Sequence, residues 1–151
     1  MNQGVVYRPK HFKTVAKMRL EDVMAKFRHD EFYKGDEIVE ILNKDMIKLE
    51  DSVYLPGTMK PAFDSIYASG LPIDNIYTFI SHRPGAELYG RHNDAEAVML
   101  VQAVGKMMYR FDDGTSCVLD PGDSLFIPNR VYHEPCAIMG PRVTLSCKML
   151  V

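Results

Sequence analysis

The hydrophobic and polar positions divide the chain into two parts with different periodicities. Before about residue 70, apolar residues recur three or four positions apart, a spacing that is typical of amphipathic helices. This pattern predicts a helix over 15–27, a second helix over 36–49 and a short helix over 61–68, with Gly35 between the first two. We expect this part of the chain to contribute packing rather than chemistry.

From residue 71 onward, short runs rich in β-branched and aromatic residues are separated by turn signals. Two of these turns are Asp112-Asp113-Gly114 and Pro121-Gly122-Asp123. The predicted strands cover 75–81, 87–92, 97–104, 106–111, 116–119, 124–128, 131–133 and 142–151. About eight short strands with frequent turns favour a closed or double-sheet β body. The interpretation is one mainly β domain over 1–151, with a helical N-terminal portion at 1–70 and a β-barrel core at 71–151.

Composition narrows the class of protein. The 151 residues are 46% hydrophobic and 25% charged, as in ordinary globular proteins, and the net charge of −2 gives no electrostatic footprint for nucleic acid. No apolar run is long enough to span a membrane, and the N-terminus shows no apolar signal segment. Three cysteines without metal-type spacing are expected to be reduced thiols. The expected location is therefore the cytoplasm.

Three residues give the clearest chemical signal. His92 and Asp94 are two positions apart, so on a strand their side chains point to the same face. His133 follows Asp94 by 39 positions, which is far enough for the chain to return on another strand. Two imidazoles and one carboxylate from two strands form a facial triad, which leaves coordination positions open and favours Fe(II) or another divalent metal.

Short motifs around these residues resemble those of the cupin superfamily, over roughly 76–151. They are Gly90-x-His92-x-Asp94, Gly105 after an apolar strand, Pro121-Gly122-Asp123 with Ile127-Pro128, and His133. The resemblance implies a double-stranded β-helix of the cupin or jelly-roll type, behind two or three N-terminal α-helices. Because the triad has aspartate as its acid, it resembles that of the Fe(II)/2-oxoglutarate-dependent oxygenases, including the JmjC-like branch. This implies that His92, Asp94 and His133 are the metal ligands.

Arg142 and Thr144 resemble the Arg-x-Thr pair that many 2-oxoglutarate oxygenases place about nine positions after the distal histidine. There the guanidinium pairs with the distal carboxylate of the cosubstrate, to which its planar donors are matched. On a strand, Arg142, Thr144, Ser146 and Lys148 share one face. That face either lines a cavity inside the barrel or is the solvent side of an outer strand.

One departure from the JmjC-like pattern bears on the cosubstrate. The lysine that usually binds its carboxylate aligns with Met107, and Lys106 is one residue out of phase. The chain therefore uses Arg142 or does not bind 2-oxoglutarate. Tyr109 is in phase with Met107 and either adds a hydroxyl to the cavity or is a core tyrosine.

Three functional hypotheses follow. The first is an Fe(II)/2-oxoglutarate-dependent oxygenase acting on a small molecule or peptide, with cosubstrate contacts from Arg142, Thr144 and Tyr109. The second is a cupin dioxygenase or isomerase that uses the same triad without 2-oxoglutarate. The third is a non-catalytic cupin that binds a metal or a small ligand. No nucleic-acid or membrane partner is expected, and a homodimer through a strand edge or the helical half is a further hypothesis.

Overall fold

The computed structural model describes residues 3–34, 39–43, 46–51, 54–83 and 90–150. In this part of the chain, eight strands form one antiparallel sheet in the order β1-β7-β5-β8-β4-β3-β2, and β6 pairs with β5. The strands are β1 (Val6–Arg8), β2 (Val39–Asn43), β3 (Met46–Leu49), β4 (Ile73–Ser81), β5 (Val98–Phe111), β6 (Ser116–Leu119), β7 (Ser124–Ile127) and β8 (His133–Met149).

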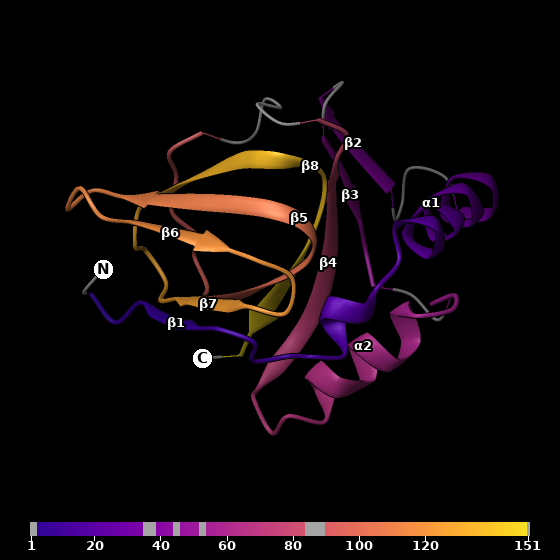
Figure 1. Ribbon diagram of the computed structural model, residues 1–151, viewed down its shortest axis with the longest axis horizontal. Helices are drawn as coiled ribbons and strands as arrows, with labels where there is room; N and C mark the ends of the chain where they lie inside the picture. Colours follow the sequence, from indigo (N-terminus) through magenta and orange to yellow (C-terminus); the bar gives the residue numbers. More distant parts are fainter. Residues whose placement is uncertain (1–2, 35–38, 44–45, 52–53, 84–89, 151) are drawn as a thin grey trace.

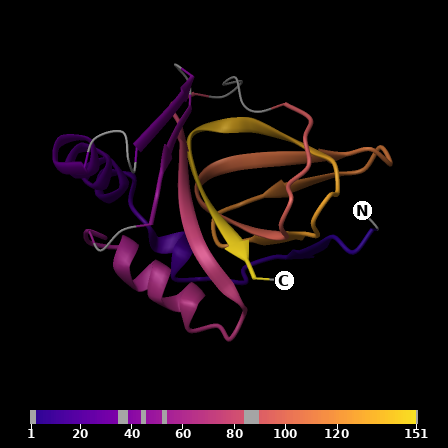
Figure 2. The same cartoon turned by 180° about the vertical axis from the view of Figure 1, so that it is seen from behind.

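The sheet coils, so β5 to β8 and β1 enclose one end of the molecule while β4, β3 and β2 extend along its side (Figure 1). The helices α1 (Leu20–Lys34) and α2 (Met59–Tyr67) lie beyond β4 and β3, on the side away from β6 and β7, as the view from behind also shows (Figure 2). Among the described residues, neither helix is long and apolar enough to cross a membrane.

The helix predicted over 36–49 is wrong, because this segment forms the antiparallel pair β2 and β3. Its residues 36–38 and 44–45 lie outside the described part. In β3 the buried Ile47 and Leu49 belong to the core beneath the helices, whereas Met46 and Lys48 alternate with them and line a cavity. Apolar residues on both faces of a short strand gave a pattern that a helix also satisfies.

The other two predicted helices are present with different bounds. The segment predicted as a helix over 15–27 is a short 3-10 turn, η1 (Val15–Lys17), followed by α1, and the helix predicted over 61–68 is α2. α2 buries Met59, Phe63 and Ile66 on one face, as expected for a spacing of three and four residues.

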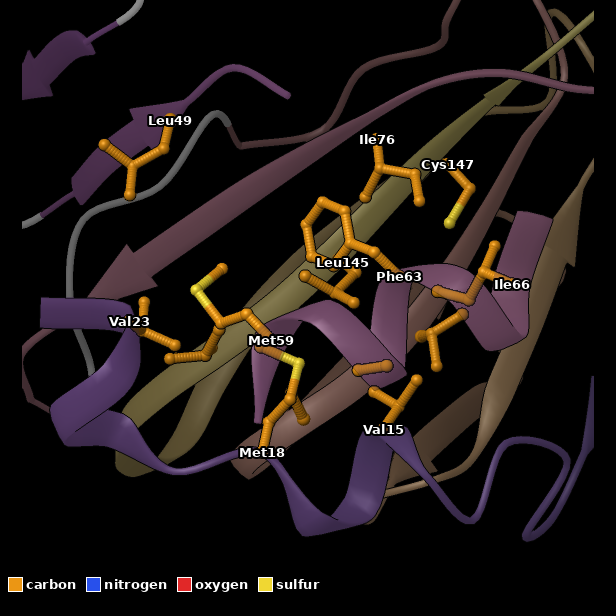
Figure 3. Packing of buried hydrophobic residues seen from close by; sticks show 14 of the residues in the cluster. Val15, Met18, Val23, Leu49, Met59, Phe63, Ile66, Ile76, Leu145 and Cys147 are labelled. Atoms are coloured by element: carbon orange, nitrogen blue, oxygen red, sulfur yellow. The ribbon is translucent and has the colours of Figure 1, made fainter. Parts of the chain in front are cut away.

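A hydrophobic core joins the helices to the outer face of the sheet. Figure 3 shows Phe63 and Met59 of α2 over β4 and β8, with Val15 of η1 packed beside α2. Ile76 of β4 and Leu145 of β8 are fully buried there, and Cys147 is one of three cysteines that all remain free thiols. Since this core fills the outer face of β4 and β8, the opposite face of those strands is left to line the interior.

Two pairs of predicted strands are each one long strand. The segments 97–104 and 106–111 join in β5, and the segments 131–133 and 142–151 join in β8. The register between β5 and β8 shifts around Gly105, so the strands continue through an irregularity instead of ending. The shift reverses which residues face inward: Val98 and Leu100 line the cavity before it, and odd-numbered Tyr109 lines it afterwards.

Asp22 links the two helices and provides a test of the fold. Its carboxylate accepts hydrogen bonds from the Thr58 backbone N–H (2.9 Å) and the Thr58 hydroxyl (2.6 Å), at the start of α2. We expect Asp22→Ala to reduce the free energy of unfolding by about 1–2 kcal/mol at neutral pH, because the charged acceptor of both Thr58 hydrogen bonds is lost. Urea unfolding of both proteins measures the difference.

The same contact has a defined pH dependence. The hydrogen bonds from Thr58 hold the pKa of Asp22 below its ordinary value of 3.8. A depressed pKa stabilises the fold above the unfolded-state pKa, and the contribution disappears as the pH falls through the folded-state pKa. The difference between wild type and Asp22→Ala should therefore shrink below about pH 4, and a constant difference down to about pH 2 would contradict this role.

Candidate metal centre

A cavity of about 370 Å³ lies against the inner face of β3, β4, β8 and β5. This volume is in the range of small-molecule sites. Its floor is built of rows of side chains that the strand register places opposite one another. The rows are Met46 and Arg142, with the buried Ser81 between them; Lys48, Phe79 and Thr144; Tyr77, Ser146 and Leu100; and Lys148 with Val98.

The main chain holds His92 and His133 side by side at the wall of this cavity. The backbone N–H of each donates to the carbonyl oxygen of the other at 2.9 Å, in an isolated antiparallel bridge. The Asp94 carbonyl accepts from the N–H of Arg130 at 2.8 Å. The predicted strand over 87–92 is therefore absent at its described end, where His92 makes only this bridge, and residues 87–89 lie outside the described part.

Both imidazole rings are oriented by a hydrogen bond from Nδ1 to a backbone carbonyl, which for His92 is that of Gly90 (2.8 Å) and for His133 that of Val131 (2.9 Å). A carbonyl oxygen only accepts, so in each neutral ring Nδ1 carries the proton and Nε2 presents a lone pair. The Nε2 atoms of His92 and His133 lie 3.9 and 3.5 Å from the Asp94 carboxylate oxygens. Burial lowers the pKa of His133, which favours the neutral ring that a metal requires.

The three ligand atoms, one from each residue, all lie within 4.8 Å of one another. Donors that share an octahedral ion at about 2.1 Å are about 3 Å apart, so small side-chain movements bring this set around one cation. Two nitrogens and one oxygen on one side leave the remaining positions open to the cavity. The donor set therefore fits a divalent first-row metal.

Contacts outside the triad hold the segment from Gly90 to Asp94 against the rest of the barrel. The Arg91 guanidinium donates to both carboxylate oxygens of Asp112, at 2.8 and 2.6 Å, and lies 3.9 Å from the centre of the Tyr132 ring. Because Asp112 is in the β5–β6 turn and Tyr132 is next to His133, these contacts connect the His92 segment to that turn and to the start of β8.

Arg142 and Thr144 of β8 lie in the cavity wall, and their polar face is the one that looks inward. Arg142 is 4% exposed, and its Nε donates to the Ser81 hydroxyl at 2.9 Å. The Thr144 hydroxyl donates to the side-chain oxygen of Gln102 at 2.8 Å. These partners orient both side chains, which gives the cavity a fixed cation next to a fixed hydroxyl.

Tyr109 also lines the cavity and is almost completely buried. Burial raises the pKa of Tyr109 to about 12, although Arg142 and Thr144 act in the opposite direction. The phenol is therefore neutral near pH 7. Met107, which aligns with the JmjC-like lysine, is buried in a second hydrophobic cluster, between β5 and residues such as Leu119 of β6 and Leu125 of β7. Lys106 instead pairs with Asp120 at 3.2 Å.

The contribution of β3 and β4 to the cavity was not predicted from the sequence. Met46 and Lys48 of β3 and Tyr77 and Phe79 of β4 all line it. The alternation of Met46 and Lys48 with Ile47 and Leu49 was the signal that could have placed them, had the segment been interpreted as a strand.

Comparison with known proteins gives the fold. No protein-family model matches the chain, and no curated protein matches it. Among solved structures, YcfD, a ribosomal oxygenase from Escherichia coli in complex with cobalt and 2-oxoglutarate, has a TM-score of 0.56 and 22% identity over 70% of this chain. A prolyl-4-hydroxylase from Pseudomonas putida has the same TM-score with 14% identity over 97% of this chain. KdgF from Halomonas sp. has a TM-score of 0.52 and 11% identity over 77% of this chain.

These likenesses confirm the predicted mainly β fold, a double-stranded β-helix of the cupin or jelly-roll type. The matched region is 32% of the YcfD chain, so this protein spans about a third of that enzyme, whereas it spans 91% of the hydroxylase and 90% of KdgF. At these identities the likeness extends to the fold alone, and the chemistry must be argued from the residues of the cavity.

Proposed function

We propose that this protein is a metal-dependent oxygenase that uses Fe(II) and 2-oxoglutarate to hydroxylate its substrate. The observation that carries the proposal is the convergence of His92, Asp94 and His133 on one wall of a cavity that also contains a buried arginine. The oxygenases among the structural neighbours support it.

Each group of side chains has a defined task in this proposal. His92, Asp94 and His133 hold the metal from one side, and the carbonyl partners of the two imidazoles keep both Nε2 atoms directed to it. Arg142 and Thr144 bind the distal carboxylate of 2-oxoglutarate and so orient the keto acid end toward the triad. When bound, the metal and cosubstrate supply the oxidising chemistry, in which dioxygen and 2-oxoglutarate yield succinate, carbon dioxide and a hydroxylated substrate.

Anaerobic titration with Fe(II) and 2-oxoglutarate tests this proposal. We expect a visible charge-transfer band when the keto acid chelates the metal, with saturation at one equivalent per chain. Arg142→Ala should raise the 2-oxoglutarate concentration at half-saturation by about 10- to 100-fold, because a charge-assisted contact is removed. Its Fe(II) affinity should be unchanged, since Arg142 is outside the triad.

Two further variants make the test specific. Arg142→Lys keeps the charge but not the planar fork, and should give an intermediate value. Arg110→Ala removes an exposed arginine that pairs with Glu134, and should behave as wild type. If the wild-type protein binds Fe(II) but shows no band, 2-oxoglutarate is not the cosubstrate.

A cupin metalloenzyme that does not use 2-oxoglutarate is the second candidate. It is favoured by the contacts of Arg142 with the protein itself, since Nε is bound by Ser81 and a terminal nitrogen lies 3.3 Å from the sulfur of Met46. In that case the guanidinium supports the barrel wall. The candidate predicts metal binding and oxygen uptake or isomerisation that are independent of 2-oxoglutarate.

A further inference from the structure

The cavity is lined by more cationic than anionic side chains. Lys48, Arg142 and Lys148 are cationic, and Asp94 and Glu96 are the carboxylates among the described lining residues. In the proposed function Asp94 is neutralised by the metal. The cavity then has an excess of positive charge, which favours an anionic ligand.

Lys48 and Lys148 lie on either side of one pair of residues. Tyr77 and Ser146 are directly opposite each other on β4 and β8, and Lys148 is two residues beyond Ser146 on the same face. Lys48 enters from the neighbouring row and extends toward this pair, with Nζ 4.4 Å from the centre of the Tyr77 ring. Two cations therefore flank a tyrosine and a serine hydroxyl.

The existing partners of these lysines are replaceable. Lys48 lies 3.8 Å from Glu40, and Lys148 lies 3.4 Å from Glu96. The two glutamate side chains are 56% and 53% exposed, so water can solvate them when the pairs separate. Exposed ion pairs of this kind contribute little to stability, so an incoming anion can replace either glutamate at a small cost in free energy.

The rest of the cavity fits an apolar body. The rings of Phe79 and Tyr109 and the aliphatic side chains of Val98 and Leu100 line it. A volume of about 370 Å³ accommodates a small molecule and not a folded partner.

We propose that the substrate is a small organic acid with an aromatic or similarly flat apolar body, whose anionic group binds between Lys48 and Lys148 beside Ser146. That this ligand is the substrate rests on the proposed function. The anion-binding site itself does not depend on the reaction. The anion site is separate from Arg142, which is two rows away from Ser146 along the sheet.

Calorimetric titration with phenylacetate and phenylacetamide tests the inference, because the two probes share a body and differ in charge. We expect the acid to bind at least about tenfold more tightly than the amide. The double variant Lys48→Gln/Lys148→Gln should reduce the difference to less than about twofold, while leaving the affinity for the amide unchanged. Lys60→Gln is the matched control, since Lys60 forms a similar exposed pair with Asp64 on α2 and is outside the cavity.

The titration is carried out with Zn(II)-loaded and with chelator-treated protein, so that ligation of the probe by a metal is recognised. A preference for the acid that persists without metal and disappears in the double variant supports the site, even if Fe(II) and 2-oxoglutarate give no visible band. Equal affinity for both probes, or no binding of the acid at millimolar concentration, overturns it. A preference that survives in the double variant and is lost in Arg142→Ala also overturns it, because the acid then binds at Arg142.

Discussion

Asp94→Asn is expected to weaken the binding of Mn(II) or Co(II) by more than about 100-fold, since the loss of a supporting hydrogen-bond partner alone typically costs 10- to 100-fold. Asp94 supplies the anionic oxygen of the triad, between the Nε2 atoms of His92 and His133. An amide oxygen is a neutral and weaker ligand for a divalent ion. Titration followed by the electron paramagnetic resonance of free Mn(II) measures the affinity.

Glu96→Gln is the matched control for this prediction. Glu96 is two residues beyond Asp94 and lines the same cavity, but its carboxylate pairs with Lys148 and is not part of the triad. Its removal should change the metal affinity by only a few-fold. The Asp94 side chain is 43% exposed, so its variant should remain folded, and thermal unfolding without metal checks this. Metal binding that is the same in Asp94→Asn and Glu96→Gln would rule out the proposed centre.

Gly105→Ala is expected to reduce the free energy of unfolding by about 3 kcal/mol or more, through strain in the left-handed region and through a steric clash. Gly105 has φ +75°, and a Cβ built there would lie 2.5 Å from the backbone oxygens of Met139 and Pro141. Backbone atoms of the paired strand β8 cannot move aside as a flexible side chain can. Urea unfolding measures the loss, and the same displacement should weaken metal binding at His133.

Gly114→Ala separates the two causes. Gly114 has φ +85°, similar to that of Gly105, but a Cβ there meets nothing within 4 Å. We expect a loss of about 1–2 kcal/mol from backbone strain alone. If Gly105→Ala were no more destabilising than Gly114→Ala, the close approach of β5 and β8 would have no energetic importance.

The sequence contained enough information to predict the β core and to predict that the residues of the triad lie close together. Turn chemistry at Asp112-Asp113-Gly114 and Pro121-Gly122-Asp123 marks the ends of β5, β6 and β7 correctly, because these turns are local. The spacing of His92 and Asp94 predicted that their side chains point the same way, although the segment is not a regular strand. Two residues of extended chain place alternate side chains on one side with or without a sheet partner.

The features that could not be predicted from the sequence depend on tertiary contacts. The segment 39–49 became a hairpin because β3 pairs with β4, a contact between residues that are separated by a helix. The segment that contains Lys48 was consequently predicted to contribute packing, and Lys48 was not predicted to line the cavity. Likewise, Gly105 was predicted to separate two strands, 97–104 and 106–111, that are one strand in the structure. The irregularity at Gly105 is caused by the close approach of β8 and does not end the strand.

The triad and part of the cavity wall come from different segments, which has a consequence for protein engineering. The triad comes from the segment around His92 and from the start of β8, whereas Lys48 and Tyr77 come from β3 and β4. The cavity-facing side chains of β3 and β4 can be exchanged without altering the three residues of the proposed metal centre. Libraries confined to β3 and β4 should therefore retune ligand selection while keeping the proposed metal centre, so this barrel is a suitable scaffold for new specificities.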